Sequence, residues 1–356
     1  MARRRGALRR GPVRVERPPA RVLPMLGLSL LLLVAGWTAL WLFARYEAVA
    51  TFARWRTSEQ SFGRAWDCPN EHVGGYPLGI VLTCDRPTFK GPVADGLFQG
   101  GLDGLKAEAR LYFPTNVVVT LAGPLALTEV AGPRRLDARW SSALLTLRGL
   151  LPADLDRGLL ELADLQLGPP PLAASARQVT IGFKPINRAA DARIDLEATL
   201  TAEDAHVPAL DAALGSSDPL QLRFSGFATQ VAFTGGVTLP ELLDPWVAAG
   251  GQLHVGNLDI VKGAFQAHAT GRLGLDEEHR LQGRLDTGFS GLEPVAARLG
   301  LPIAAVKVGG LLSGLLGGAA PASDAPATEL SLPIIAKDGR LRLGPVDTGV
   351  RLLPLY

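Results

Sequence analysis

Apolar and polar residues alternate along much of the chain beyond residue 64. Between Arg193 and Leu200 the even positions hold Ile, Leu, Ala and Leu, whereas the odd positions hold Arg, Asp, Glu and Thr. Successive side chains of a β-strand point to opposite faces, so this pattern predicts a strand with one dry and one wet face. Strands of this kind build antiparallel sheets that lie with one face on a core or a groove.

The same period recurs often enough to predict a mainly β fold, built as a large, curved antiparallel sheet with short covering helices. We expect strands at residues 78–84, 105–112, 117–121, 136–147, 159–167, 179–183, 193–200, 220–224, 231–233, 252–260, 264–275, 280–286, 329–336 and 340–343. Asp338 and Gly339 should form a type I′ turn between the last two strands.

Helical periodicity and Pro or Gly punctuation indicate several short helices among these strands. We expect them at residues 208–214, 240–249, 293–299 and 304–316, with a linker at 319–328. Pro245 should kink or split the second helix, because proline removes a helical hydrogen bond.

Residues 22–43 form an uncharged, leucine-rich run that is long enough to cross a membrane as one helix. The tail before it, residues 1–21, carries eight arginines and one acidic residue, and such basic flanks stay in the cytoplasm. The run ends in aromatic residues without a small-residue cleavage site, which indicates an uncleaved signal anchor. Residues 44–63 continue as a stalk helix that ends at Gly63.

Behind the anchor we expect one large periplasmic β domain, with an N-terminal half at residues 64–205 and a C-terminal half at residues 206–356. The first 44 residues hold eight arginines and one glutamate, so 28 basic and 33 acidic residues remain in the rest of the chain. This exported part is mildly acidic, which argues against a nucleic-acid partner. The expected location is the inner membrane, crossed once, with the bulk of the chain in the periplasm.

The chain has two cysteines, Cys68 and Cys84, both on the exported side. In an oxidising compartment a pair at this spacing indicates a disulfide, which would join the strand at residues 78–84 to the segment around Trp66. A metal or redox site is the alternative, but zinc would need more Cys or His ligands than His72 supplies.

Known catalytic and cofactor patterns are missing from the sequence. The chain has no Gly-Lys dipeptide and therefore no P-loop, and no glycine triplet fits a dinucleotide fingerprint. Its five histidines are scattered, although His254 and His268 could approach each other on adjacent strands. We therefore expect no catalytic site, no cofactor, no metal site and no enzymatic activity.

Several short segments together resemble the uncharacterised proteobacterial envelope proteins called domain of unknown function 2125. These segments are Trp66-Asp67-Cys68, Gly75-Tyr76-Pro77-Leu78-Gly79-Ile80, Gly250-Gly251-Gln252-Leu253, Gly271-Arg272-Leu273-Gly274-Leu275-Asp276 and Asp338-Gly339-Arg340-Leu341-Arg342-Leu343-Gly344-Pro345. The later ones also look like the hairpins of AsmA-like envelope proteins. The resemblance implies a β-rich envelope protein, with lipid handling by analogy alone.

The dry faces of the expected strands suggest a function, because a large one-faced sheet needs a cover and exposed apolar patches mark binding sites. The expected acyl-chain groove is lined by Leu105, Leu111, Ile194, Leu196, Leu273 and Leu285. The leading hypothesis is therefore a membrane-anchored protein that binds lipid or serves as an envelope scaffold. The alternatives are a protein-interaction module that recruits a partner to the membrane and a hydrolase whose site the sequence hides.

Overall fold

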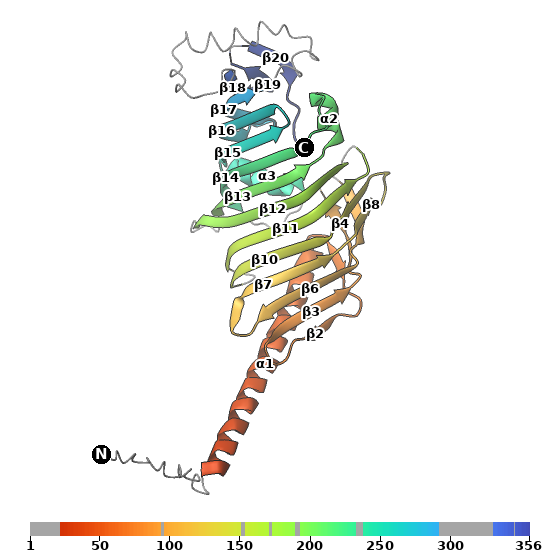
Figure 1. Ribbon diagram of the computed structural model, residues 1–356, viewed down its shortest axis with the longest axis vertical. Helices are drawn as coiled ribbons and strands as arrows, with labels where there is room; N and C mark the ends of the chain where they lie inside the picture. Colours follow the sequence, from red (N-terminus) through yellow and green to blue (C-terminus); the bar gives the residue numbers. More distant parts are fainter. Residues whose placement is uncertain are drawn as a thin grey trace, which may run out of the picture.

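The computed structural model describes residues 22–93, 96–150, 154–170, 173–188, 193–232, 238–291, 330–344 and 346–356. Within these ranges the protein consists of one long helix, a long twisted sheet of 20 strands and two short helices (Figure 1). The expected mainly β fold with a large antiparallel sheet and an N-terminal apolar helix is therefore confirmed.

Helix α1 (Val22–Ser61) is continuous over 40 residues. Its part from Pro24 onwards contains an apolar stretch long enough to cross a membrane. The expected anchor and stalk are thus two parts of one helix, and the chain turns away at Gly63, which has a φ of 73° that favours glycine.

Fifteen strands form the main row of the sheet, and every pairing in it is antiparallel. In spatial order they are β2 (His72–Gly74), β3 (Gly79–Asp85), β6 (Gly104–Arg110), β7 (Phe113–Ala122), β10 (Ser142–Leu150), β11 (Asp154–Gly168), β12 (Ala174–Arg188), β13 (Arg193–Ala205), β14 (Leu220–Ala232), β15 (Leu253–Lys262), β16 (Phe265–Leu275), β17 (Leu281–Ser290), β18 (Leu330–Lys337), β19 (Arg340–Leu343) and β20 (Val346–Arg351). The row begins beside α1 and ends at the far end of the long axis of the molecule (Figure 1).

A second, shorter row branches from β11. Its strands are β1 (Ala65–Asp67), β4 (Thr88–Val93), β5 (Gly96–Gly101), β8 (Leu125–Glu129) and β9 (Arg135–Arg139). Strand β11 pairs with β10 through residues 154–163 and with β9 through residues 166–168. Asp164 lies between these two parts with a φ of 52°, and this left-handed conformation interrupts the regular strand geometry where β11 passes from one row to the other.

The structure corrects several expected strand boundaries. The strand expected at residues 136–147 is two strands, β9 and β10, because they pair with different neighbours on either side of Trp140. The strand expected at 220–224 and the described residues of the one expected at 231–233 belong to one strand, β14, in which Gln230 with a φ of 58° interrupts the alternation; residue 233 lies outside the described residues. Strands β1, β2, β4, β5, β8 and β20 were not expected, since glycines and short lengths hide their period.

The two short helices connect neighbouring strands. Helix α2 (Pro208–Leu214) matches its expected range, and α3 (Leu239–Ala248) continues through Pro245 without splitting. A capping box of Thr238 and Glu241 stabilises the first turn of α3. Pro245 lies in the next turn, where its missing amide removes one helical hydrogen bond. The helices expected at 293–299 and 304–316 and the linker at 319–328 lie outside the described residues.

The expected division at residue 205 falls between two paired strands. Strand β13 pairs with β14 along almost its whole length, so one sheet spans both halves of the β domain. Asp338 and Gly339 have φ values of 50° and 68°, the positive pair that a type I′ turn requires.

Candidate functional site

One cross-strand row of residues, apolar at every position except Thr287, runs along the main row of strands from β2 to β18. Residues that are paired across antiparallel strands lie on the same face of the sheet. Following the register from strand to strand gives Val73, Leu82, Ala107, Val119, Leu145, Leu160, Ile181, Leu200, Phe224, Leu258, Ala269, Thr287 and Leu332. At about 4.8 Å between strands, this row is roughly 60 Å long. We call the face that carries it the apolar face.

The neighbouring cross-strand row, one residue along each strand, lies on the opposite face and is polar. It consists of His72, Thr83, Lys106, Thr120, Leu144, Glu161, Thr180, Thr201, Arg223, Asp259, His268, Gly288 and Ser331. The two faces of the sheet are therefore chemically distinct over the same thirteen strands.

The middle of the apolar face is only partly buried, although Leu200 packs against the buried cluster of Ala176, Val179, Ala205 and Leu220. From Ala107 to Leu258 the residues of the row are half-buried, except Ile181, which is 37% exposed. Close-packed interiors bury their large side chains fully, as the row does at Val73 in β2. The side chains in the middle of the row thus keep part of their surface exposed.

The structure places five of the six residues of the expected groove, all except Leu111, on the apolar face. Each of them is half-buried. Their partners on neighbouring strands are Leu121 for Leu105, Val231 for Ile194, Ala228 for Leu196, Leu253 for Leu273 and Ile334 for Leu285. Leu111 lies in the turn after β6, where its amide donates to the carbonyl of Leu78 at 3.0 Å. The six do not form one cluster but are distributed along the sheet.

The second row of strands extends the apolar face around the end of the sheet beside α1. Ala138 of β9 pairs with Leu167 of β11, which continues the face into β9, β8 and β5, where Leu127 and Phe98 are buried. Helix α1 contacts β1 of the second row and β2 and β3 of the main row. The two rows therefore meet at β11 and again at α1, and enclose an apolar interior at this end.

A disulfide between Cys68 and Cys84 joins the two rows at the α1 side. Cys68 follows β1 and Cys84 is the buried end of the apolar face in β3. The disulfide connects the segment around Trp66 with β3, the strand expected at residues 78–84.

Helix α2 covers one margin of the apolar face. Val207 and Leu210 pack on a buried cluster that includes Val179, Ala205 and Leu220. Lys262 of β15 occupies an apolar-face position beside this cluster and its side chain is fully buried. Its ammonium group lies 2.6 Å from a carboxylate oxygen of Asp211 in α2 and donates to the carbonyl of Asp218.

The junction between α1 and the sheet contains a second shielded ion pair. The guanidinium of Arg64 donates two hydrogen bonds of 2.6 Å to the carboxylate of Glu59, and Trp66 donates a third at 3.1 Å. The hydrogen bonds from Arg64 lower the pKa of Glu59 below its ordinary value, against the opposing effect of burial.

The C-terminal residues fasten α3 to the turn between β16 and β17. Tyr356 stacks on His279 with ring centroids 4.4 Å apart, and its hydroxyl donates to Asp244 of α3 at 2.6 Å. Burial and this hydrogen bond raise the pKa of Tyr356 to about 12.

The described residues contain no group of three or more His, Cys, Asp or Glu side chains arranged for a metal ion. His254 is opposite Arg272, and His268 is opposite Asp259, so the two histidines do not face each other across their strands. His254 instead stacks on Phe227 with centroids 4.4 Å apart.

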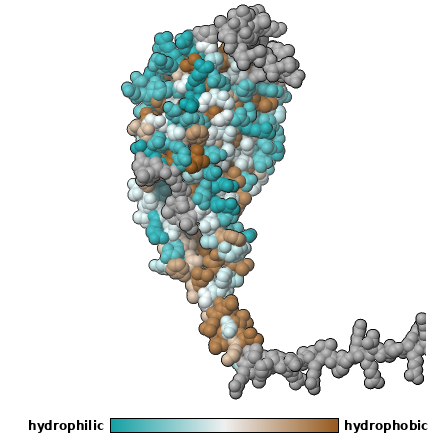
Figure 2. All heavy atoms as spheres, turned by 90° about the vertical axis from the view of Figure 1, so that its left-hand side faces the viewer, coloured by the Kyte–Doolittle hydropathy of each residue, from teal (hydrophilic) through white to brown (hydrophobic). Residues whose placement is uncertain are grey.

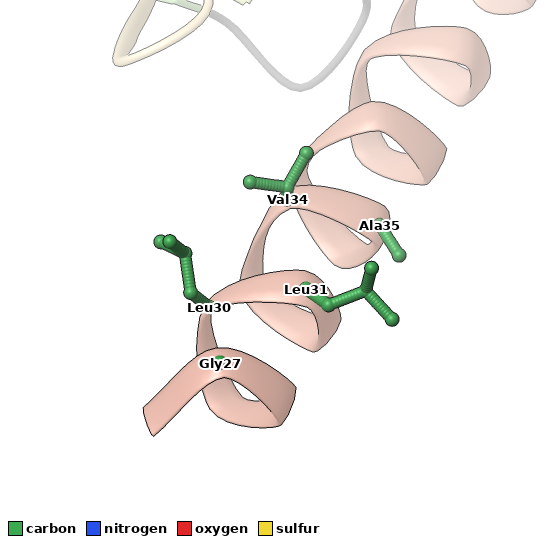
Figure 3. A pocket seen from close by; sticks show the side chains of 5 residues that line it. All are labelled: Gly27, Leu30, Leu31, Val34 and Ala35. Carbon is green, nitrogen blue, oxygen red and sulfur yellow. The ribbon is translucent and has the colours of Figure 1, made fainter. Parts of the chain in front are cut away.

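A shallow hollow on α1 is also apolar. It is lined by Gly27, Leu30, Leu31, Val34 and Ala35, whose side chains point outward from one stretch of the helix (Figure 3). It lies within the apolar segment and brings together no polar groups, so it belongs to the surface that a membrane would cover.

Sequence reasoning missed Lys262 and the ring of elements that closes the apolar interior beside α1. Lys262 follows Leu258 and Ile260 at every second position of the strand. This place in an apolar series is the one sign in the sequence that Lys262 lies on the apolar face. The closure by α1 and the second row had no comparable signal, because it depends on pairings between distant segments.

Comparison with known proteins gives one match. The family model described as "uncharacterized protein conserved in bacteria (DUF2125)" matches residues 41–350. Searches among curated proteins and among solved structures found no match. The likeness of the later hairpins to AsmA-like proteins stays a prediction. Since the match runs from α1 to β20 and covers most of the sequence, the chain belongs to the DUF2125 family of uncharacterized bacterial proteins.

Proposed function

We propose that the protein is anchored in a bacterial membrane and binds lipid acyl chains along its apolar face. The observation that carries this proposal is the row over thirteen strands, apolar except at Thr287, whose middle residues are half-buried or, at Ile181, exposed. Leaving apolar area in water costs about 25 cal/mol per Å², so a ligand that covers the face gains that free energy. Acyl chains fit such a face because aliphatic contact requires no directional partners.

The proposed location is the inner membrane, with residues 1–21 in the cytoplasm and the β domain in the periplasm. Eight arginines before α1 support this orientation. The hydrogen bond from Trp41 to the carbonyl of Gly79 at 2.8 Å, and that from Arg45 to Val73 at 3.2 Å, support a retained anchor. A cleaved signal peptide would leave these carbonyls at the sheet edge without their donors.

The proposed role is binding, not catalysis, because the side chains that converge along the face are aliphatic. A protein partner that covers the same face is the alternative, and it would take the place of lipid in the groove. Lipid binding predicts that lipid stays with the purified protein, whereas the alternative predicts that a protein partner does. What co-purifies with the protein therefore distinguishes the two.

The test is the lipid content of the full chain after extraction in mild detergent and purification. Mass spectrometry should find phospholipid or fatty acid above the level carried by an unrelated single-span protein, and the protein should take up a fluorescent fatty acid. Leu196→Asp and Ile181→Asp should abolish both signals, because a carboxylate on the apolar face must be desolvated when a chain binds.

Thr199→Asp is the matched control, since Thr199 lies on β13 like Leu196 but on the opposite face. It should leave lipid content and uptake unchanged, and all three variants should keep the wild-type melting temperature to within a few degrees. A wild-type protein without lipid or uptake would contradict the proposal. So would loss of folding in both apolar-face variants, because these side chains would then be ordinary core.

A further inference from the structure

Three residues on one side of α1 donate hydrogen bonds to backbone carbonyls at the edge of the sheet. Trp37 donates to the carbonyl of Pro77 at 2.8 Å, and Trp41 and Arg45 donate to Gly79 and Val73. The spacing of four residues places the three donors on one helix face. They fix the turn between β2 and β3 against a defined part of α1.

Trp37 and Trp41 lie inside the apolar segment, and Arg45 lies just beyond its end. Arg45 is the first charged residue after the apolar run, and Trp37 precedes it by eight residues, which corresponds to about 12 Å along the helix axis at 1.5 Å per residue. The hydroxyl groups of Thr38 and Tyr76 are also hydrogen-bonded, at 3.0 Å. When α1 crosses a membrane, the β2–β3 turn is therefore level with the boundary between headgroups and acyl chains, not with the water beyond it.

The tips of the two hairpins beside α1 expose large apolar side chains. Tyr76 is 51% exposed and Leu78 is 64% exposed in the β2–β3 turn, and Tyr112 and Phe113 are 52% and 62% exposed in the β6–β7 turn. Figure 2 shows hydrophobic atoms gathered at the foot of the β domain, where it narrows to α1, and a mostly hydrophilic body above it. Aromatic residues favour the membrane interface, because their rings are apolar and their hydroxyl groups still reach polar partners.

These tips also continue the apolar face. Leu78 has the same parity as Ile80 and Leu82 of β3, and it is hydrogen-bonded to Leu111, the expected groove residue nearest α1. The end of the face beside α1 thus coincides with the side chains that reach the membrane.

We propose that the tips of the β2–β3 and β6–β7 turns insert into the membrane leaflet on the side of the β domain and open the apolar face to that leaflet. The insertion of Tyr76, Leu78, Tyr112 and Phe113 stands on the geometry of α1 alone. The passage of acyl chains from the leaflet to the face rests on the proposed lipid-binding function. The molecule that enters the apolar face between these two turns is a phospholipid of the host membrane.

The experiment uses the full chain in vesicles of phosphatidylethanolamine and phosphatidylglycerol. With Cys68 and Cys84 joined, Leu78→Cys and Phe113→Cys each supply one thiol for an environment-sensitive fluorophore. Both probes should shift to shorter wavelength and be quenched by spin labels carried on the lipid chains near the headgroup. Thr199→Cys, on the polar face, should report water and be quenched only by soluble quenchers.

Probes at Leu78 and Phe113 that report water, like the probe at Thr199, would overturn the insertion. If insertion holds, the double variant Leu78→Asp with Phe113→Asp should lose transfer of fluorescent lipid from the vesicle to the protein. Transfer at the wild-type rate in this variant would show that acyl chains do not enter the apolar face through these two turns. Inserted probes on a wild-type chain that carries no lipid would contradict the proposed function and leave the insertion standing, so the two failures are distinguishable.

Discussion

At the scale of single residues, the fold depends on two ion pairs that are shielded from water. Lys262 is a charged residue on the apolar face, and burial of its ammonium group is tolerated because Asp211 and the carbonyl of Asp218 surround it. Removing water from a charge costs several kcal/mol, so such a residue is stable only with its partners in place. The pair fixes α2 over one margin of the apolar face.

Asp211→Asn should destabilise the protein by about 3–5 kcal/mol, because it leaves the buried ammonium of Lys262 without a compensating charge. Glu203→Gln is the control, since Glu203 pairs with Arg177 where both side chains are about half exposed; its cost should be under about 1 kcal/mol. Thermal unfolding of the full chain in detergent measures both. Equal melting temperatures for the two variants would show that the Lys262 pair contributes no more than a surface pair.

Glu59 provides a prediction with a defined dependence on pH. Its pKa is lower in the folded protein than the ordinary value of 4.5, because Arg64 donates to the carboxylate. The stabilisation is therefore complete above the unfolded pKa and is lost as the pH falls through the lowered pKa. Glu59→Gln should melt below the wild type at neutral pH, and the difference should vanish in acid.

Glu47→Gln is the matched control on the same helix, because Glu47 lies 3.7 Å from Arg54 and both side chains are well exposed. Its melting temperature should follow the wild type at every pH. A gap between Glu59→Gln and wild type that stays constant down to the most acidic pH would contradict the stated role of the carboxylate.

At the scale of elements, period-two alternation was sufficient to predict most of the main row, and the period was clearest where one face is open. Arg193 to Leu200 falls within β13, and α2 matches its expected range. The alternation failed where pairing partners change along a strand, as at Trp140, and in the second row, where Gly91, Gly100 and Gly101 replace side chains. Packing between segments that are far apart in the sequence decides which strands meet at β11 and at α1. Local sequence does not encode this packing.

The cysteine pair allows a test of two statements: that a disulfide joins the two rows of strands, and that the domain lies in an oxidising compartment. Thiol labelling of the unreduced, denatured protein from cells should detect no free cysteine. The variant with Cys68→Ala and Cys84→Ala should lose about 3 kcal/mol of stability by the chain-entropy estimate for a loop of this length. Two reactive thiols in the wild type would place the domain in a reducing compartment and contradict the periplasmic location.

At the scale of the whole molecule, the architecture is polar on one face, apolar on the other and attached to α1 at one end. Each strand adds about 4.8 Å to the apolar face, so the length of the face is set by the number of paired strands. The register keeps the face continuous from β2 beside α1 to β18 (Figure 1). On the proposed lipid-binding function, a face that begins beside α1 and continues to β18 offers acyl chains contact along its whole length.

The proposed function implies that this face holds acyl chains in the cell, and site-specific photocrosslinking can detect them there. A photoreactive amino acid is placed at Leu145, Leu200 or Leu258 of the apolar row, and at Thr180 or Thr201 of the polar row as controls. After irradiation of growing cells, the three apolar-row positions should carry phospholipid adducts and the two controls should not. Adducts to a protein at the apolar positions, or no lipid adduct at any of them, would contradict the account.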